Sequence, residues 1–137
     1  MRMDNFTIKA QEAIDNARKL ADELDHQEID SLHLLQSLLE QEDGIIKPLM
    51  ERLGANPGAV LQGVEKELDK KPSVSGSAAG QVYISEALKN TFSQAEEEAD
   101  QLQDEYVSTE HLFLGMVEDT GSEAGKILKQ NGVDRDS

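Results

Sequence analysis

The chain has 137 residues and a formal net charge of −15, with 28 acidic against 13 basic side chains. So negative a surface repels phosphate, which argues against binding to nucleic acid or to an anionic membrane surface. Leu, Ile, Val and Phe together exceed the fraction of about one fifth below which acidic chains stay disordered, so we expect a folded domain. Cysteine is absent, which excludes disulfides, thiol nucleophiles and Cys-ligated metals. Because no segment has the pattern of a membrane span or a signal peptide, we expect a cytoplasmic protein.

Apolar residues recur every three or four positions nearly everywhere, which predicts an all-α fold. In the first half this pattern predicts helices over about 6–24, 31–42, 45–53 and 57–70. Gly54 suits the left-handed end of the third helix, and Asn56-Pro57 suits the start of the fourth. A small, turn-rich connector follows at 72–80, and no strand pattern is present.

The second half repeats this order with a long helix, a short one over about 108–118 and another over about 122–131. The apolar face predicted for the long helix consists of Leu88, Phe92, Ala95, Ala99 and Leu102.

A shift of 78 residues places the second half on the first, with His33-Leu34-Leu35 on His111-Leu112-Phe113. Other matches fall on core-facing and capping positions, such as Gly54 on Gly132. We therefore predict one globular domain of two pseudo-twofold four-helix repeats, over about 4–70 and 83–137, joined by a linker over about 71–82. The last helix of the second repeat is then truncated at Ser137, which predicts a fragment of a longer protein.

Two short motifs resemble catalytic sequences without the context that such chemistry needs. Residues 121–126 have the wrong spacing for a phosphate-binding loop, and Asp119-Thr120-Gly121 lacks the β-rich frame of an aspartic protease. Both fit a turn between helices. We expect no catalytic residues and a binding function; a small helical hydrolase is the enzyme alternative, and no constellation of residues supports it.

The histidines and the acidic runs each have a structural and a functional interpretation. His33 and His111 lack a second ligand four residues on, so we expect no metal and predict that each packs in the first turn of its helix and bonds the preceding loop. Metal binding and a surface contact are the alternatives. Residues 96–98 and 104–105 form acidic runs that predict a solvated face or a contact surface for basic or unfolded polypeptide.

The two copies of a long helix followed by residues 31–35 and 109–115 resemble the double Clp N-terminal domain. That module precedes the ATPase rings of Clp unfoldases and disaggregases, and residues 2–7, 42–44 and 71–76 are most similar to its ClpB branch. The resemblance covers essentially the whole chain. It implies a module that recruits unfolded or aggregated protein for delivery to the ring. The resemblance implies that this fragment is monomeric and holds no cofactor. ATP and Mg are expected for the ATPase modules of the parent protein, which is expected to be a ring hexamer.

The family's binding positions fall here on Thr7, Asp104 and Glu110, with apolar groove contributions at Phe92 and His111. The structural alternatives are a helix cap for Thr7, core packing for Phe92, and solvation at helix ends for Asp104 and Glu110. Two other partners are possible: a folded adaptor, as in the ClpA and ClpC branches, or a basic protein that an acidic decoy inhibits.

Overall fold

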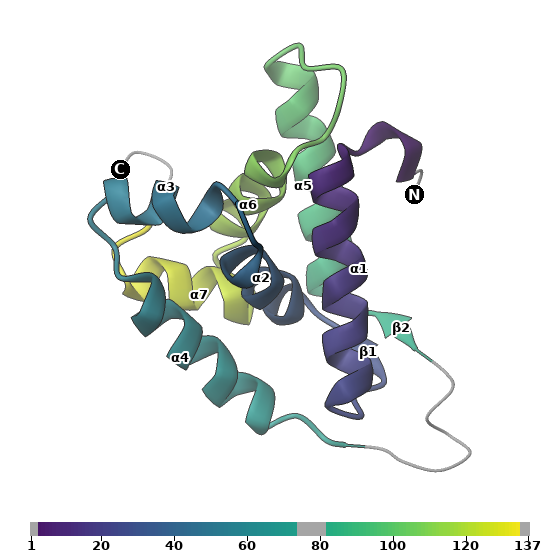
Figure 1. Cartoon of the computed structure of the whole chain (residues 1–137), viewed down its shortest axis with the longest axis vertical. Helices are drawn as coiled ribbons and strands as arrows, with labels where there is room; N and C mark the ends of the chain where they lie inside the picture. Colours follow the sequence, from purple (N-terminus) through teal and green to yellow (C-terminus); the bar gives the residue numbers. More distant parts are fainter. Residues whose placement is uncertain (1–2, 74–81, 135–137) are drawn as a thin grey trace.

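The computed structural model describes residues 3–73 and 82–134, so most of the predicted linker lies outside the described residues. Before the gap come α1 (Ile8–Glu23), α2 (Ser31–Glu40), α3 (Ile46–Arg52) and α4 (Pro57–Asp69), with a 3-10 turn, η1 (Met3–Asn5), ahead of α1 (Figure 1). After it come α5 (Glu86–Gln101), α6 (Thr109–Glu118) and α7 (Glu123–Gln130). The prediction of an all-α fold is confirmed.

Two short parallel pairings connect the halves, and here the prediction of no strand was wrong. Strand β1 (Glu28–Ile29) pairs with β2 (Tyr83–Ile84), with Ile29 opposite Ile84. A second, isolated bridge joins Phe6 to Val107, so Phe6 precedes α1 instead of starting it. Strands of two residues are too short to show alternation in the sequence, and each is held by a partner far away in the chain.

The shift of 78 residues relates the halves in space as well as in sequence. It carries the bounds of α1 and α2 onto those of α5 and α6, and it carries the Phe6–Val107 bridge onto the Ile84–Ile29 pair. Gly54 and Gly132 end α3 and α7 with φ of 84° and 81°. The halves are therefore pseudo-twofold partners that exchange strands. The boundaries predicted for each repeat and for the linker stay predictions.

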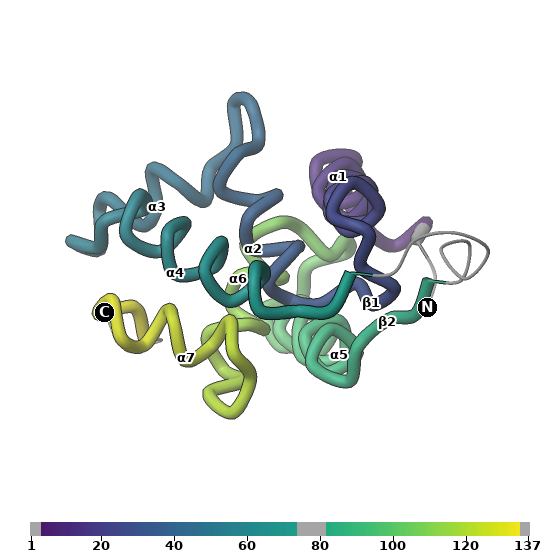
Figure 2. Tube along the Cα trace, turned by 90° about the horizontal axis from the view of Figure 1, so that it is seen from below, coloured from purple at the N-terminus to yellow at the C-terminus, as the bar shows by residue number. Residues whose placement is uncertain are grey.

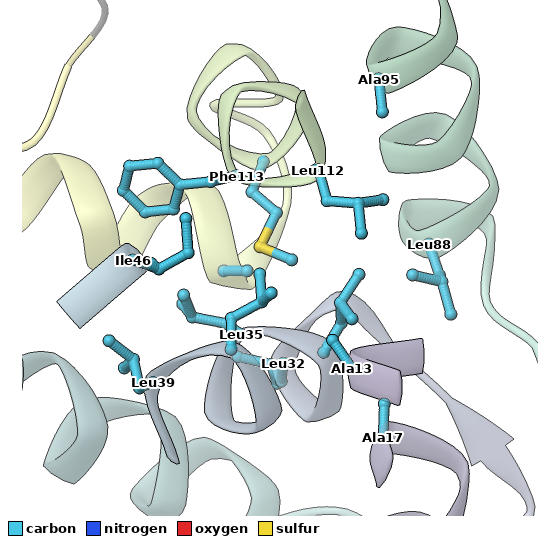
Figure 3. Packing of buried hydrophobic residues seen from close by; sticks show 14 of the residues in the cluster. Ala13, Ala17, Leu32, Leu35, Leu39, Ile46, Leu88, Ala95, Leu112 and Phe113 are labelled. Atoms are coloured by element: carbon cyan, nitrogen blue, oxygen red, sulfur yellow. The ribbon is translucent and has the colours of Figure 1, made fainter. Parts of the chain in front are cut away.

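The core is centred on α2 and α6, each flanked by the first helix of its own half. Every residue from Ser31 to Leu39 is buried, and Figure 3 shows Leu35, Ile46 and Phe113 among the apolar side chains between these helices. Figure 2 shows α4 beside α7. The buried face of α1 consists only of alanines, at 10, 13, 17 and 21, which lets α2 approach closely.

Helices α5 and α6 approach each other closely at Gly115. A Cβ there would stand 2.7 Å from the carbonyl oxygen of Thr91, so only glycine fits. In the first half the equivalent of Gly115 is Ser37, whose hydroxyl donates to the carbonyl oxygen of Ala13 at 2.7 Å. The same helix crossing is therefore closed by a hydrogen bond in one half and by direct contact in the other.

Two residues at the end of α5 differ from prediction. Leu102 is 57% exposed, because α5 ends at Gln101 and the chain turns through the left-handed Gln103 (φ 61°). Glu98, placed with the solvated acidic run, is buried beside Ala95 and Ala99. The helical period brings one carboxylate of that run inward, where Gln94 donates to it at 3.2 Å.

Candidate functional site

The first turn of α6 is held by His111, which links a helix cap to a surface carboxylate. Its Nδ1 accepts the backbone N–H of Ser108 at 2.8 Å, so the ring proton of the neutral form lies on Nε2. Nε2 then donates to Oδ2 of Asp104 at 2.8 Å. The ring itself is buried, whereas the Asp104 side chain is half exposed. His111 therefore fixes the direction of a carboxylate that solvent and ligands can reach.

The equivalent ring in the first half, His33, makes the same cap but ends inside the protein. Its Nδ1 accepts the Asp30 backbone N–H at 2.9 Å, and its Nε2 lies 2.9 Å from Nδ1 of His26. Burial, and next the neighbouring His26, lower the pKa of His33 to about 4. Burial also lowers the pKa of His26. Both rings are therefore neutral near pH 7, and the prediction that each helix-starting histidine bonds its preceding loop is confirmed.

The structure brings most of the predicted binding residues to one end of the molecule, where α1 begins and α5 ends (Figure 1). Thr7 caps α1 by accepting from the N–H of Ala10, and its own N–H donates to the carbonyl of Val107 at 2.9 Å. Asp104 lies in the loop that contains Val107. Glu110 is exposed in the first turn of α6. We call Asp104, Glu105 and Glu110 the carboxylate rim.

Exposed apolar side chains occur beside the carboxylate rim. Ile8, the first residue of α1, is 77% exposed, and Tyr106, next to Val107, is 52% exposed. A shallow acidic groove, with a volume of about 360 Å³, runs along the end of α5 and includes Glu97 and Asp104. Apolar contact and negative charge are thus available side by side at this end.

Phe92 occupies a different environment from the carboxylate rim. It is buried, and its ring meets that of Phe6 edge to face at 6.1 Å between centroids. The other side of Phe92 lines an open apolar hollow of about 330 Å³ between α1, α2, α5 and β2. We call this space the β2 hollow; its wall includes Ile14, Ile29, Leu34, Ile84, Leu88 and Phe92, with Asp15 and Arg18 at its edge.

Sequence reasoning did not identify the β2 hollow or the exposed apolar residues around β2. Val82, Tyr83 and Ile84 are all more than two fifths exposed. Their apolar character was visible in the sequence, but no helical stripe includes them. The 78-residue shift could have revealed the β2 hollow, because it places the large side chains of Phe6 and Phe92 opposite the smaller ones of Ile84 and Ile14.

Two kinds of feature, metal-ligand clusters and membrane-spanning helices, are absent from the described residues. No cluster of three or more His, Asp or Glu side chains within residues 3–73 and 82–134 could hold a metal ion. None of the helices in those ranges is long and apolar enough to cross a bilayer. Residues 119–122 form the turn between α6 and α7, as the helix–turn–helix interpretation of the two motifs there predicts.

Comparison with known proteins gives consistent matches over nearly the whole chain. The sequence pattern of the Clp repeat (R) N-terminal domain matches residues 5–131. The chaperone protein ClpB of Nitratidesulfovibrio vulgaris is 38% identical over 99% of this chain and 16% of its own length. ClpB of Bacillus anthracis is 43% identical over 88% of this chain and 14% of its own length. The chain thus spans about one sixth of the length of these curated relatives.

Solved structures with the same fold include two N-terminal domains. That of Hsp104 from Candida albicans has a TM-score of 0.81 at 26% identity, covering 96% of this chain and 85% of that one. That of the ClpV1 ATPase from E. coli has a TM-score of 0.78 at 23% identity, covering 92% of this chain and 78% of that one. The second likeness concerns the fold alone.

Proposed function

Because the chain belongs to the Clp repeat (R) N-terminal domain family, we propose that it is the substrate-engaging N-terminal domain of a ClpB-type, ATP-dependent protein disaggregase. In this role it binds unfolded or aggregated polypeptide and helps to deliver it to the ATPase ring of the parent protein. ATP and magnesium belong to the ATPase modules of that parent, which is a ring hexamer. The domain itself acts by binding.

The observation that supports this proposal is the meeting of exposed apolar side chains and oriented carboxylates where α1 begins and α5 ends. An unfolded segment offers apolar side chains and basic residues without a fixed shape. Ile8 and Tyr106 supply adaptable apolar contact, and the carboxylate rim supplies attraction for Lys and Arg. Such a shallow surface binds many sequences weakly, and weak binding suits a domain that releases its client onward.

Each of the five predicted binding residues has a role in this proposal. Asp104 and Glu110 contact the client directly, and His111 acts through Asp104 by holding its carboxylate. Thr7 positions the start of α1 against the loop of Val107. Phe92 acts from beneath, by supporting Phe6 on one side and lining the β2 hollow on the other.

The test is an NMR titration of the domain with a permanently unfolded protein, such as reduced and carboxymethylated lactalbumin. We expect signals of residues 102–111 to shift, and affinity at low salt to fall about threefold in Asp104→Asn and in Glu110→Gln. Glu51→Gln, an exposed change on α3, is the matched control and leaves affinity unchanged. Shifts scattered over the whole surface, or equal losses in the control, contradict the proposal.

Two further measurements separate this function from its alternatives. A folded adaptor that displaces the unfolded protein would indicate the adaptor-docking role of related domains. Binding to any basic protein that disappears at high salt, with no effect of apolar substitutions such as Ile8→Ser, would indicate an acidic decoy.

A further inference from the structure

The β2 hollow exists because two equivalent positions carry side chains of different size. On one side of the pseudo-twofold, Phe6 of the first half packs edge to face on Phe92 of the second half, and both rings are buried. The equivalent pair on the other side, again with one residue from each half, is Ile84 and Ile14. These smaller side chains line the β2 hollow without closing it, and Ile84 stays 44% exposed where Phe6 is 2% exposed.

The backbone of β2 has a second edge, which faces away from β1. The N–H of Tyr83 donates to the carbonyl of Gln27 at 2.7 Å, and the N–H of Ser85 donates to that of Ile29 at 2.9 Å. Because backbone groups alternate along a strand, the N–H and C=O of Ile84 point away from β1. Within the described ranges no hydrogen bond reaches either group.

The equivalent carbonyl in the other half is already occupied. The side-chain amide of Gln11 donates to the carbonyl of Phe6 at 2.9 Å. The residue equivalent to Gln11 is Lys89, whose ammonium lies 3.8 Å from Glu86 instead. The Phe6 side of the pseudo-twofold therefore has both its hollow and its strand edge covered by side chains, whereas on the Ile84 side no described residue covers either.

We propose that an extended polypeptide segment adds to the open edge of β2 as a further strand and places one large apolar side chain in the β2 hollow. The Ile84 N–H would donate to the segment and the Ile84 C=O would accept from it, so the occupant must be extended and not helical. The proposal rests on the proposed function, because the segment is part of an unfolded client, and it adds where and in which conformation that client binds.

Charge indicates what should flank the apolar side chain of the segment. Glu28, on β1 opposite Tyr83, and Glu86, two residues beyond Ile84, are exposed carboxylates close to β2, and Glu86 is also paired with Lys89 at 3.8 Å. Arg18, at the edge of the β2 hollow, is already paired with Asp15 at 2.7 Å. Within a chain of net charge −15, this edge favours a segment whose apolar residue is flanked by Lys or Arg.

The first arm of the test fills the β2 hollow. The probe is a short fluorescent peptide with a central Phe, alternating Thr residues and Lys at both ends, and binding to the whole chain is followed by anisotropy. The double variant Ile14→Phe, Ile84→Phe reproduces the equivalent Phe6–Phe92 pair, so we expect it to fold and to bind the peptide about tenfold more weakly. Ile45→Phe, also at an exposed isoleucine, is the matched control and binds normally.

The second arm uses the unmodified chain, so it does not depend on how the variants fold. A series of peptides carries one N-methyl group at each backbone amide in turn. Strand addition predicts that binding falls at every second amide, because only alternate N–H groups face β2. Equal tolerance at all positions overturns strand addition.

The two proposals fail in different ways. If neither the peptide nor unfolded protein binds the native chain, the proposed function itself is wrong. If both bind, and binding ignores the filled hollow and N-methylation while responding to Asp104→Asn, the client uses only the carboxylate rim and the inference about β2 is wrong.

Discussion

The equivalent residues His33 and His111 make the same helix cap through Nδ1, but their Nε2 atoms bond to different partners. The Nε2–H of His33 donates a hydrogen bond to Nδ1 of His26, and both rings are buried and neutral. The Nε2–H of His111 donates to the carboxylate of Asp104, which is half exposed. The residue seven positions before each histidine, His26 in one half and Asp104 in the other, decides whether the hydrogen-bond network ends in the core or at the surface. The two halves therefore share one helix cap, but its hydrogen-bond network ends inside the protein in the first half and at a half-exposed carboxylate in the second.

Removing the two rings should show this division most strongly. We expect His33→Ala to lower the free energy of unfolding by about 3 kcal/mol, because it removes a cap, leaves a cavity and orphans the buried His26 nitrogen. His111→Ala should cost about 2 kcal/mol, since water can solvate the Asp104 carboxylate that it leaves behind. Urea unfolding of both variants measures the difference. Equal losses, or a larger loss for His111→Ala, contradict the comparison.

The helix crossings differ in the same way and can be tested at Gly115. Gly115→Ala pushes a Cβ against the backbone of Thr91, and we expect a loss of about 2 kcal/mol. Ser37→Ala, at the equivalent position, loses one buried hydrogen bond and should cost about 1 kcal/mol. Gly121→Ala, where an added Cβ meets only a side-chain oxygen at 3.9 Å, is the control and should change stability by less than about 0.5 kcal/mol. Thermal and urea unfolding give these values.

Acid should destabilise the first half through its histidine pair. The pKa of His33 falls from 6.5 to about 4 on folding, so the unfolded chain binds more protons between these values and stability falls as pH falls through that window. Between pH 7 and pH 5 we expect a loss of about 1.5 to 2 kcal/mol that is absent in His33→Gln. Urea unfolding across this range tests it, and a parallel pH dependence in the variant would contradict it.

The smallest expected effect on stability is at Asp104, the surface partner of His111. Asp104→Asn keeps an oxygen that can accept from His111 but removes the charge, so stability should fall by only about 0.5 kcal/mol. Its larger consequence should be in client binding, as proposed above. Measuring both on one protein sample separates the structural from the binding role, and a stability loss as large as that of His111→Ala would show that the carboxylate is structural.

Much of the fold could be predicted because its signals are local. Residues three and four apart define the buried faces of α1 and α5, and short-range caps such as Asn56 and Gly54 mark helix ends. The repeat was detectable because the shift of 78 residues superposes caps and core positions together. For the same reason the roles of His33 and His111 in their helix starts could be predicted from sequence alone.

The features that escaped prediction depend on distant parts of the chain. The β1–β2 pair needs a partner more than fifty residues away, and the exposure of Leu102 depends on the residue at which α5 stops. The β2 hollow is a difference between two side-chain pairs, Phe6–Phe92 and Ile84–Ile14, that meet only after folding. Whether the carboxylate rim binds a client cannot be read from helical periodicity, since a solvated face and a contact surface have the same pattern.

The exchanged strands make each half the missing piece of the other. The residues before α1 pair with the loop of Val107, and the residues before α5 pair with β1. A single half expressed alone would leave its own entry segment and its own acceptor loop unpaired, and both would fit a second identical copy. The arrangement within one chain is that of an isologous homodimer, in which the same two segments pair twice across a twofold axis.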